Sequence, residues 1–416
     1  MSLAVVDASL DGELVGLRCE GGRIAALGPG VAAEPGDEMI DAAGALLVAA
    51  LVNGHTHAAM TLFRGYGGEL PLMRWLQEKI WPIEAKLEDE DVYWGTRLAC
   101  LEMIRTGTAR FWDMYWHPRA TARAVRDAGL EATIGGPIFD AGGELGETRQ
   151  RALADLDAME ELGPTIGRTL APHSIYMVSG DLLRWTAETA TERGVPIHIH
   201  LSETEQEVSD CLATHGVRPA AYLERLGLLG ERTVLAHGVW LDREELELIA
   251  ARRCTVVTNP VANMKLAVGG VFPYPLAREA GVAVGLGTDG AGSNDSLDLL
   301  ADLKAFALVQ RHAARDPTVV GATEAWQIAT GGSAPLLAGG EPPLRVGSPA
   351  NFLLLRRDSH ELGLGELASD LVYAATGSVV DTTVVAGRPL MRAGEVDGAA
   401  EVVARAAERA RGLGIA

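Results

Sequence analysis

The sequence has few of the features that mark secreted or membrane-spanning proteins. Only four of its 416 residues are cysteines, and they lie far apart with no Cys-x-x-Cys spacing. This pattern indicates neither a zinc cage of thiolates nor a disulfide framework, so we expect a reducing, cytoplasmic setting. The amino terminus has no basic segment followed by an apolar core. No apolar run approaches the roughly 20 residues that span a bilayer, so we expect a soluble protein with no membrane partner.

Positive charge is also scarce. The chain has 36 lysines and arginines against 56 aspartates and glutamates, a formal net charge of −20. Such a surface repels a phosphate backbone, so we expect no nucleic-acid partner. A hydrophobic content of 48% is ample for a large core. The length fits either two ordinary domains or one large barrel with an appendage, and a homo-oligomer is compatible with it.

From Leu46 onward, short apolar runs alternate with longer amphipathic stretches. One such stretch, 89–105, ends at Gly107 and places apolar residues on one face. Eight strands that are each followed by a helix are typical of a (β/α)8 TIM-like barrel, in which catalytic groups lie at the carboxyl ends of the strands. The eight runs are 46–53, 108–114, 131–138, 166–172, 195–201, 233–237, 254–258 and 282–288.

Both ends of the chain have β-like patterns. Residues 1–45 contain short strand candidates that are too small to stand alone, and further candidates follow residue 350. We therefore predict an α/β protein of two domains: a small β-sandwich built from both chain termini, 1–45 plus 345–416, and the barrel, 46–344. Residues 399–416 have the pattern of an amphipathic helix.

His55 and His57 follow the first strand of the predicted barrel. In a strand, side chains two residues apart point to the same side, so these imidazoles face one way at the barrel mouth. Two adjacent neutral imidazoles are commonly half of a zinc or iron site. A single His-x-His is a weak signal, but further residues of the right kind recur at strand ends.

The fifth, sixth and eighth strands end in chemically active side chains. His200 ends the fifth strand with Glu203 just beyond, His237 ends the sixth, and Asp289 follows the eighth. Asp289 alone could be a turn cap, but the coincidence of five positions at strand ends favours a site. His198, one layer deeper, is better interpreted as a hydrogen-bonded interior histidine.

These residues resemble the amidohydrolase superfamily, and specifically its mononuclear deaminase branch, which includes the 5'-methylthioadenosine/S-adenosylhomocysteine deaminases. The similarity runs from about Leu46 to Leu355. The matching strings include Val52-Asn53-Gly54-His55-Thr56-His57-Ala58-Ala59-Met60, Trp81-Pro82-Ile83-Glu84, Asp113-Met114-Tyr115, Ala171-Pro172-His173-Ser174, His198-Ile199-His200-Leu201-Ser202-Glu203-Thr204, Leu235-Ala236-His237-Gly238 and Gly287-Thr288-Asp289-Gly290-Ala291.

The resemblance implies a role for each matching residue. One zinc per subunit, with iron as the alternative metal, would be held by His55, His57, His200 and Asp289. Glu203 would be the proton shuttle, His237 would hydrogen-bond the attacking hydroxide, and Asp289 would accept its proton. Glu84 would bind ribose hydroxyls, His173 would touch the nucleoside, and Trp75 would wall the pocket. From the residues alone, Glu84 is equally a solvated charge, and Trp75 follows a helical spacing that fits core packing.

The chain departs from the family pattern after the third strand. Homocysteine-binding members carry an arginine there, whereas this chain has Gly135-Gly136. Arg149 and Arg151 are the nearest cationic candidates for binding a substrate carboxylate. This departure bears on which 5'-substituent the enzyme prefers more than on the chemistry at the base.

The main hypothesis is a zinc-dependent hydrolytic deaminase of an adenine nucleoside, an aminohydrolase that gives an inosine-type product and ammonia. The candidate substrates are adenosine, 5'-deoxyadenosine, 5'-methylthioadenosine and S-adenosylhomocysteine. A second hypothesis keeps the metal but changes the substrate to another aminated heterocycle, such as a guanine- or cytosine-type base or an s-triazine, including dechlorination. A third is a metal-free scaffold on the same barrel.

Overall fold

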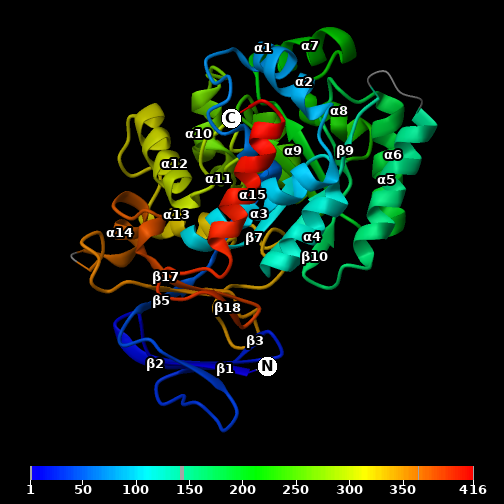
Figure 1. The fold of residues 1–416 in the computed structure, drawn as a ribbon. Helices are drawn as coiled ribbons and strands as arrows, with labels where there is room; N and C mark the ends of the chain where they lie inside the picture. The colour runs from blue at the N-terminus through cyan, green and yellow to red at the C-terminus, as the bar shows by residue number, and fades with distance from the viewer. Residues whose placement is uncertain (1, 141–144, 364, 416) are drawn as a thin grey trace.

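The computed structural model describes residues 2–140, 145–363 and 365–415 (Figure 1). Each of the eight predicted runs contains a strand, and the strands form two parallel four-stranded sheets ordered β10-β8-β7-β6 and β12-β13-β14-β15. Their bounds are β6 (Leu51–Thr56), β7 (Thr108–Met114), β8 (Glu131–Gly135), β10 (Ile166–Arg168), β12 (Ile197–Leu201), β13 (Thr233–His237), β14 (Thr255–Thr258) and β15 (Ala283–Leu286). A short parallel pair, β9 (Pro137–Ile138) and β11 (Ala171–Pro172), extends the lines of β8 and β10.

Backbone contacts bring the two sheets together on both sides. Leu170 forms a parallel bridge with Ile197, which joins the β10 edge to β12. At the other edge the Asp289 N–H donates to the His55 carbonyl at 3.0 Å. Closure of all eight strands into one barrel stays a prediction from the sequence.

Helices follow the strands as the periodicity predicts. The predicted helix 89–105 is α3 (Asp89–Thr106), which begins with a capping box between Glu88 and Asp91 and ends at Gly107 with φ +91°. The other helices of this part are α4 (Pro118–Ala128), α5 (Leu145–Glu160), α6 (Gly180–Arg193), α7 (Glu205–His215), α8 (Pro219–Arg225), α9 (Arg243–Ala251), α10 (Pro260–Lys265), α11 (Tyr274–Ala280), α12 (Leu299–Ala314) and α13 (Ala322–Ala329). Among the described residues, no helix combines the length and apolarity needed to cross a bilayer.

Both chain ends contribute to one eight-stranded sheet, as predicted. Its order is β18-β17-β16-β5-β1-β2-β3, with β4 paired to β1. The bounds are β1 (Ser2–Leu10), β2 (Glu13–Glu20), β3 (Arg23–Gly28), β4 (Glu38–Asp41), β5 (Leu46–Ala49), β16 (Phe352–Leu355), β17 (Val380–Val385) and β18 (Arg388–Met391). The two-layered form of a sandwich, and the division of the chain into two domains, remain predictions.

The predicted strand 46–53 is two strands that belong to different sheets. Leu47 in β5 packs with Leu3 and Phe352 in the core of the terminal sheet. The chain then turns at Ala50, and Leu51 in β6 packs in the main core. The predicted domain boundary at residue 46 assigns β5 to the barrel. The strand pairing of β5 instead places it in the terminal sheet.

A winding segment after β6 lies at the end of the molecule opposite the terminal sheet (Figure 1). It consists of η1 (Ala58–Phe63), α1 (Leu72–Trp75), a π-helical turn η2 (Leu76–Ile80) and α2 (Trp81–Glu84). The predicted terminal helix is α15 (Ala399–Gly412), drawn in red in Figure 1, where it lies across α3. Two smaller elements complete the chain: α14 (Leu367–Tyr373) and η3 (Gly377–Val379).

Candidate metal centre and active site

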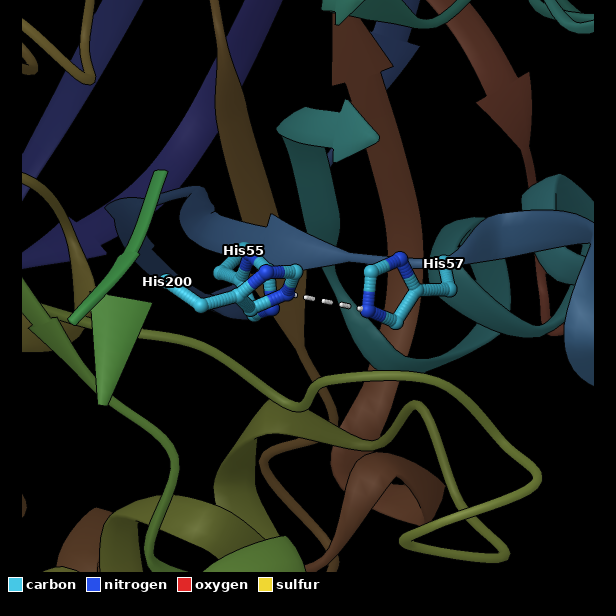
Figure 2. Close-up of side chains that lie close together, drawn as sticks. All are labelled: His55, His57 and His200. Atoms are coloured by element: carbon cyan, nitrogen blue, oxygen red, sulfur yellow. Dashed lines mark hydrogen bonds between the residues drawn. The ribbon is translucent and has the colours of Figure 1, made fainter. Parts of the chain in front are cut away.

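Three histidines converge at the carboxyl ends of β6 and β12. His55 lies in β6, His57 follows it, and His200 lies in β12. The Nε2 atoms of His57 and His200 are 3.4 Å apart, and the His55 ring centroid lies 4.9 Å from those of both other histidines. In Figure 2, His55 and His57 extend from one strand and His200 reaches toward them from another. The parallel strands thus bring together side chains that are 143 residues apart.

Asp289 completes the group from the loop after β15. Its Oδ1 lies 3.4 Å from Nε2 of His55 and 3.2 Å from Nε2 of His57. His55 Nε2 and Asp289 Oδ1 are fully buried, and neither has a well-formed hydrogen bond to any described residue. Buried polar atoms without a partner are rare in native proteins and need an explanation such as an ion.

The donor set fits a metal ion. The nitrogens of His55, His57 and His200 lie within 4.8 Å of one another, as do ligand atoms of His55, His237 and Asp289. Burial lowers the pKa of His55 to about 3, so this imidazole is neutral, as a ligand must be. Burial opposes a charge on His57 as well, but the Asp289 carboxylate outweighs it and raises the pKa of His57 to about 9, so a metal ion would displace a proton there. Three imidazoles and one carboxylate suit zinc or a similar divalent ion. The structure therefore brings together all four predicted ligands.

Each of the three histidines is oriented through its second nitrogen. The Nδ1 of His57 donates to the Met114 carbonyl at 2.5 Å, and the Nδ1 of His200 donates to the His173 carbonyl at 2.7 Å. His55 Nδ1 shares a hydrogen bond with His198 Nε2 at 2.9 Å. These contacts leave all three Nε2 atoms facing the centre. The prediction that His198 is a hydrogen-bonded interior histidine is confirmed, and its partner is the buried His55.

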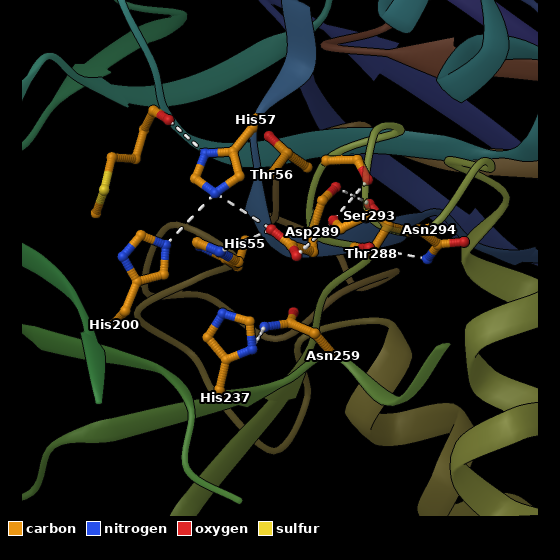
Figure 3. A network of polar contacts seen from close by, with 12 residues as sticks. His55, Thr56, His57, His200, His237, Asn259, Thr288, Asp289, Ser293 and Asn294 are labelled. Atoms are coloured by element: carbon orange, nitrogen blue, oxygen red, sulfur yellow. Dashed lines mark hydrogen bonds and ion pairs between the residues drawn. The ribbon is translucent and has the colours of Figure 1, made fainter. Parts of the chain in front are cut away.

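The Asp289 carboxylate is held in place by its own loop. The Ser293 hydroxyl donates to its Oδ2 at 2.6 Å, and Thr288 and Asn294 bond the adjacent backbone (Figure 3). Burial opposes the charge on this carboxyl group, but the neighbouring His55 and His57 imidazoles outweigh it and hold the pKa of Asp289 well below its usual range. Ser293-Asn294 is among the strings that match the family, but the sequence predicted no role for Ser293.

His237 and Glu203 form the second half of the centre. His237 ends β13 with φ +73°, and its Nδ1 donates to Asn263 Oδ1 at 2.9 Å, so its Nε2 is free to face the cavity. Asn259 lies beside the same ring (Figure 3). Glu203 Oε1 lies 3.9 Å from His237 Nδ1. Burial raises the pKa of Glu203, so this carboxyl group can hold a proton closer to neutral pH than an exposed one.

Residues 46–390 match the Amidohydrolase family, which is most of the chain. The chain belongs to this family.

Three similar proteins give the family match more detail. The 5'-deoxyadenosine deaminase of Methanoregula boonei is 46% identical over 90% of this chain and 86% of its own length. The 5-methylthioadenosine/S-adenosylhomocysteine deaminase 1 of Archaeoglobus fulgidus is 38% identical over 91% of this chain and 89% of its own. The crystal structure of an adenosine deaminase from Xanthomonas campestris with bound zinc has a TM-score of 0.93 and 32% identity over 100% of this chain and 99% of its own.

This amidohydrolase has a cavity of about 560 Å³ above the metal centre. His57, His200, Glu203, His237 and Asp289 lie at its base. The remaining wall is mostly aromatic and aliphatic, and comes largely from the segment between β6 and α3. Among the residues of this wall are Met60, Leu72, Trp75, Leu76, Ile80, Trp81, Glu84, Leu87, Trp116, Phe139, His173, Tyr176 and Met177.

The cavity includes three of the five predicted substrate contacts. Trp75, Glu84 and His173 all line it, and burial raises the pKa of Glu84, which lies beside Tyr115 and Trp116. Trp75 also packs against Met60 and donates from its indole nitrogen to the Tyr66 carbonyl at 3.2 Å. Trp75 therefore both packs in the core and lines the cavity.

The other two predicted contacts, Arg149 and Arg151, lie elsewhere. Arg149 stands over the Trp185 ring, 5.6 Å from its centroid. Arg151 lines a separate cavity of about 40 Å³ together with Asp155. Both side chains are carried by α5, which packs on the outside of the β8 and β10 edge and so directs them away from the large cavity.

Glu207 is a further buried acid near the centre that the sequence did not identify. Its two oxygens accept the backbone N–H groups of Ser202 and Glu203, each at 2.9 Å. It is 4% exposed and is not among the described residues that line the cavity. The Thr204-x-x-Glu207 spacing was the only signal, and it predicts no more than a helix cap.

Proposed function

We propose that this amidohydrolase is a zinc-dependent hydrolytic deaminase of an adenine nucleoside, giving an inosine-type product and ammonia. The observation that supports this most is the meeting of three imidazoles and Asp289 beside Glu203 and His237 at the base of a large cavity. The relatives named as nucleoside deaminases cover most of the chain at up to 46% identity. The zinc in the adenosine deaminase structure supports zinc as the metal here.

His55, His57, His200 and Asp289 would hold the metal. A zinc ion bound there supplies a nucleophile at neutral pH, because it lowers the pKa of coordinated water to about 7. Asp289 is ionised and can accept a proton at Oδ1, while Ser293 fixes its other oxygen.

Glu203 then serves as the proton shuttle. It donates a proton to a ring nitrogen of the adenine amidine, which makes the amino-bearing carbon electrophilic. It next takes up the proton that Asp289 accepted and passes it to the amino group, which leaves as ammonia. The hydroxyl proton of the attacked carbon returns Glu203 to its acid form as the carbonyl of the product forms. General acid–base steps of this kind contribute about 10²–10⁴-fold in rate. His237 donates from Nε2 to the oxygen that develops at the attacked carbon, and because its Nδ1 proton is already donated to Asn263, it does so as the doubly protonated imidazolium.

The outer cavity would hold the nucleoside. Glu84 presents two carboxylate oxygens that can accept hydrogen bonds from vicinal ribose hydroxyls, Trp75 forms an apolar wall, and His173 touches the nucleoside. Aromatic walls suit the flat faces of a purine.

We further propose that the 5'-substituent is uncharged. The described residues that line the cavity include no lysine or arginine, and residues 141–144, which the structure does not describe, are Ala, Gly, Gly and Glu in the sequence. A buried carboxylate without a cationic partner is costly. Adenosine, 5'-deoxyadenosine and 5'-methylthioadenosine are therefore favoured over S-adenosylhomocysteine, whose 5'-group carries a carboxylate.

The substrate panel tests this preference directly. We expect kcat/KM for S-adenosylhomocysteine to be at least about ten-fold below that for its carboxamide, which has the same shape without the negative charge. Equal values for the acid and the amide would contradict the preference while leaving the deaminase assignment intact. Ammonia release from free bases or triazines, and none from any nucleoside, would overturn the assignment itself.

Replacing Glu203, the proposed proton shuttle, tests the mechanism. Glu203→Gln keeps the shape of the side chain but removes its exchangeable proton. We expect kcat to fall by at least about 10²-fold, with one metal ion per chain retained because Glu203 is not among the proposed ligands. Unchanged turnover would remove Glu203 from the mechanism.

We also propose that the eight strands close into a (β/α)8 barrel beside a small β-sandwich from both termini, with β5 in the terminal sheet. The bridge at Leu170 and the bond from Asp289 to the His55 carbonyl support closure at the two open edges. The acidic composition and the lack of paired cysteine motifs support a cytoplasmic enzyme of small molecules with no nucleic-acid partner.

A further inference from the structure

The turn between β12 and α7 carries Glu203 and is held by an unusual helix cap. Thr204 is the N-cap residue of α7 and its hydroxyl accepts from the Glu207 N–H at 3.2 Å. In a capping box, the acid at this third position bonds the backbone N–H of the N-cap residue itself. Here Glu207 instead reaches one and two residues further back, to the N–H groups of Glu203 and Ser202. Its carboxylate therefore secures the turn that precedes the helix.

This turn needs such a restraint because its backbone is strained. Ser202 has φ +50°, in the left-handed region that residues other than glycine rarely adopt. Conformations of this kind cost of the order of a few kcal/mol and persist only where the surroundings impose them. On one side the Ser202 carbonyl accepts from the Trp240 N–H at 2.9 Å, and on the other side both oxygens of Glu207 accept from the turn. Burial raises the pKa of Glu207 to about 7, and the two backbone N–H groups oppose this rise because bonds to a charged acceptor are stronger than those between neutral groups.

Glu207 can influence the chemistry only through Glu203. Its side chain is buried and lies outside the cavity wall, so it does not touch a substrate there. Glu203 does line the cavity, and the direction of its side chain follows from the backbone that Glu207 holds. We propose that Glu207 is a positioning residue that sets the carboxyl group of Glu203 at the distance required for proton transfer. This proposal rests on the function proposed above, in which Glu203 is the proton shuttle.

Glu207→Gln is the first test, because it preserves shape and leaves one accepting oxygen. The amide NH2 then faces one of the two backbone N–H groups, and the turn relaxes on that side. Misplacement of a catalytic group by about 1 Å can cost about 10²-fold in rate. We therefore expect kcat to fall about 10–100-fold, with KM for 5'-deoxyadenosine changed less than about two-fold and one metal ion retained per chain. Glu207→Ala should lose at least as much.

The chain contains a matched control in Glu245. It occupies the same third position, on α9, is 3% exposed, and accepts the Ala220 N–H at 2.9 Å. It is not among the described residues that line the cavity. Glu245→Gln should therefore lower the melting temperature without lowering kcat of the folded, metal-loaded enzyme. If Glu245→Gln and Glu207→Gln lose kcat equally, the effect is one of general stability and the proposal is overturned.

A double-mutant cycle decides whether the two acids act as a unit. In the Glu203→Gln background, Glu207→Gln should cause no further loss of kcat, because the group it positions no longer transfers protons. If the kcat losses of the two single substitutions multiply in the double variant, the proposal is overturned. Unchanged kcat in both Glu207 variants would also overturn it. If Glu203→Gln alone retains full turnover, the proposed role of Glu203 fails instead, so the two failures are distinguishable.

Discussion

At the scale of single residues, the candidate metal centre depends on groups that do not face its middle. Each histidine proposed as a ligand has two ring nitrogens, and the partner of the distant nitrogen decides which way the other one points. Two of these partners are backbone carbonyls, which no substitution can remove. The third is the side chain of His198, which makes it the one partner open to mutation.

We expect His198→Phe to weaken metal binding about 10–100-fold, the range typical for loss of such a partner. Phenylalanine fills most of the same buried space but leaves His55 Nδ1 without its bond, so the ring is no longer fixed. Competition with a chromogenic chelator measures the change. His215→Phe is the control, because His215 stacks on Tyr222 with 3.8 Å between ring centroids and belongs to α7, outside the centre. Equal metal affinity in both variants would contradict the role of His198.

The sequence predicted the residues at and just beyond strand ends, but it gave no role to the loop residues that support them. His55, His200 and His237 were found because a strand fixes which way its side chains point and where it ends. Asn263 and Ser293 belong to strings that match the family, Asn263-Met264-Lys265-Leu266 and Ser293-Asn294, but no role was predicted for them, because their partners depend on loop paths that have no periodic pattern. Arg149 was predicted to bind a substrate carboxylate because of its charge and its nearness in sequence to the third strand. Neither property shows which face of α5 it occupies.

At the scale of elements, α12 connects the two loops that carry the site. Asp302, fully buried in this helix, accepts the Val261 N–H at 3.3 Å at the start of α10, and the Asn294 side chain at 2.9 Å in the loop after β15. Burial raises its pKa to about 8, and the nearby Asp298 and Asp289 add to this, although its hydrogen bonds oppose it. The folded protein therefore keeps a proton here that the unfolded chain, with a pKa of 3.8, releases.

The sign of the resulting pH dependence follows from this difference. Between about pH 4 and 8 the folded state binds one more proton at Asp302 than the unfolded state. Its contribution to the free energy of unfolding thus falls as pH rises, by at most about 1.4 kcal/mol per pH unit. Asp302→Asn cannot titrate, so we expect the decline between pH 5 and 8 to become shallower. Urea unfolding at a series of pH values measures the slope, and an unchanged slope would contradict the prediction.

Element types were predictable from the sequence, whereas the sheet to which each element belongs was not. The run 46–53 is apolar throughout, so periodicity cannot show that the chain leaves one sheet at Ala50 and enters another. The division depends on partners far away in sequence, Phe352 for β5 and Phe111 for β6. The helical spacing of Leu72, Trp75 and Leu76 was recognised, but the π-helical turn that follows was not.

At the scale of the whole molecule, the last helix of the chain lies away from the sheet that the two chain ends build together. The terminal sheet lies at one end, while α15 leaves it and runs back along α3 (Figure 1). Ala406 and Ala410 of α15 belong to the same apolar cluster as Phe63 and Trp75. Helix α15 packs against η1, whose Met60 lines the cavity, so the last helix of the chain supports the cavity wall through η1.

One ion pair fixes this arrangement. Arg409 Nε donates to Asp91 Oδ1 at 2.6 Å, and Asp91 is the buried acid whose other oxygen caps the start of α3. Arg409→Ala leaves that carboxylate without its cation, so we expect the free energy of unfolding to fall by about 1–2 kcal/mol, reduced from the full value because the guanidinium is partly exposed. Arg405→Ala, on the same helix, removes an exposed pair with Glu408 at 3.2 Å and a guanidinium that lies 5.9 Å from the centroid of the Trp94 ring, and it should cost less than about 1 kcal/mol. Urea unfolding of the two variants compares them directly. Equal losses would mean that α15 is held by its apolar face alone, and that the pair with Asp91 adds nothing to the docking of the chain end.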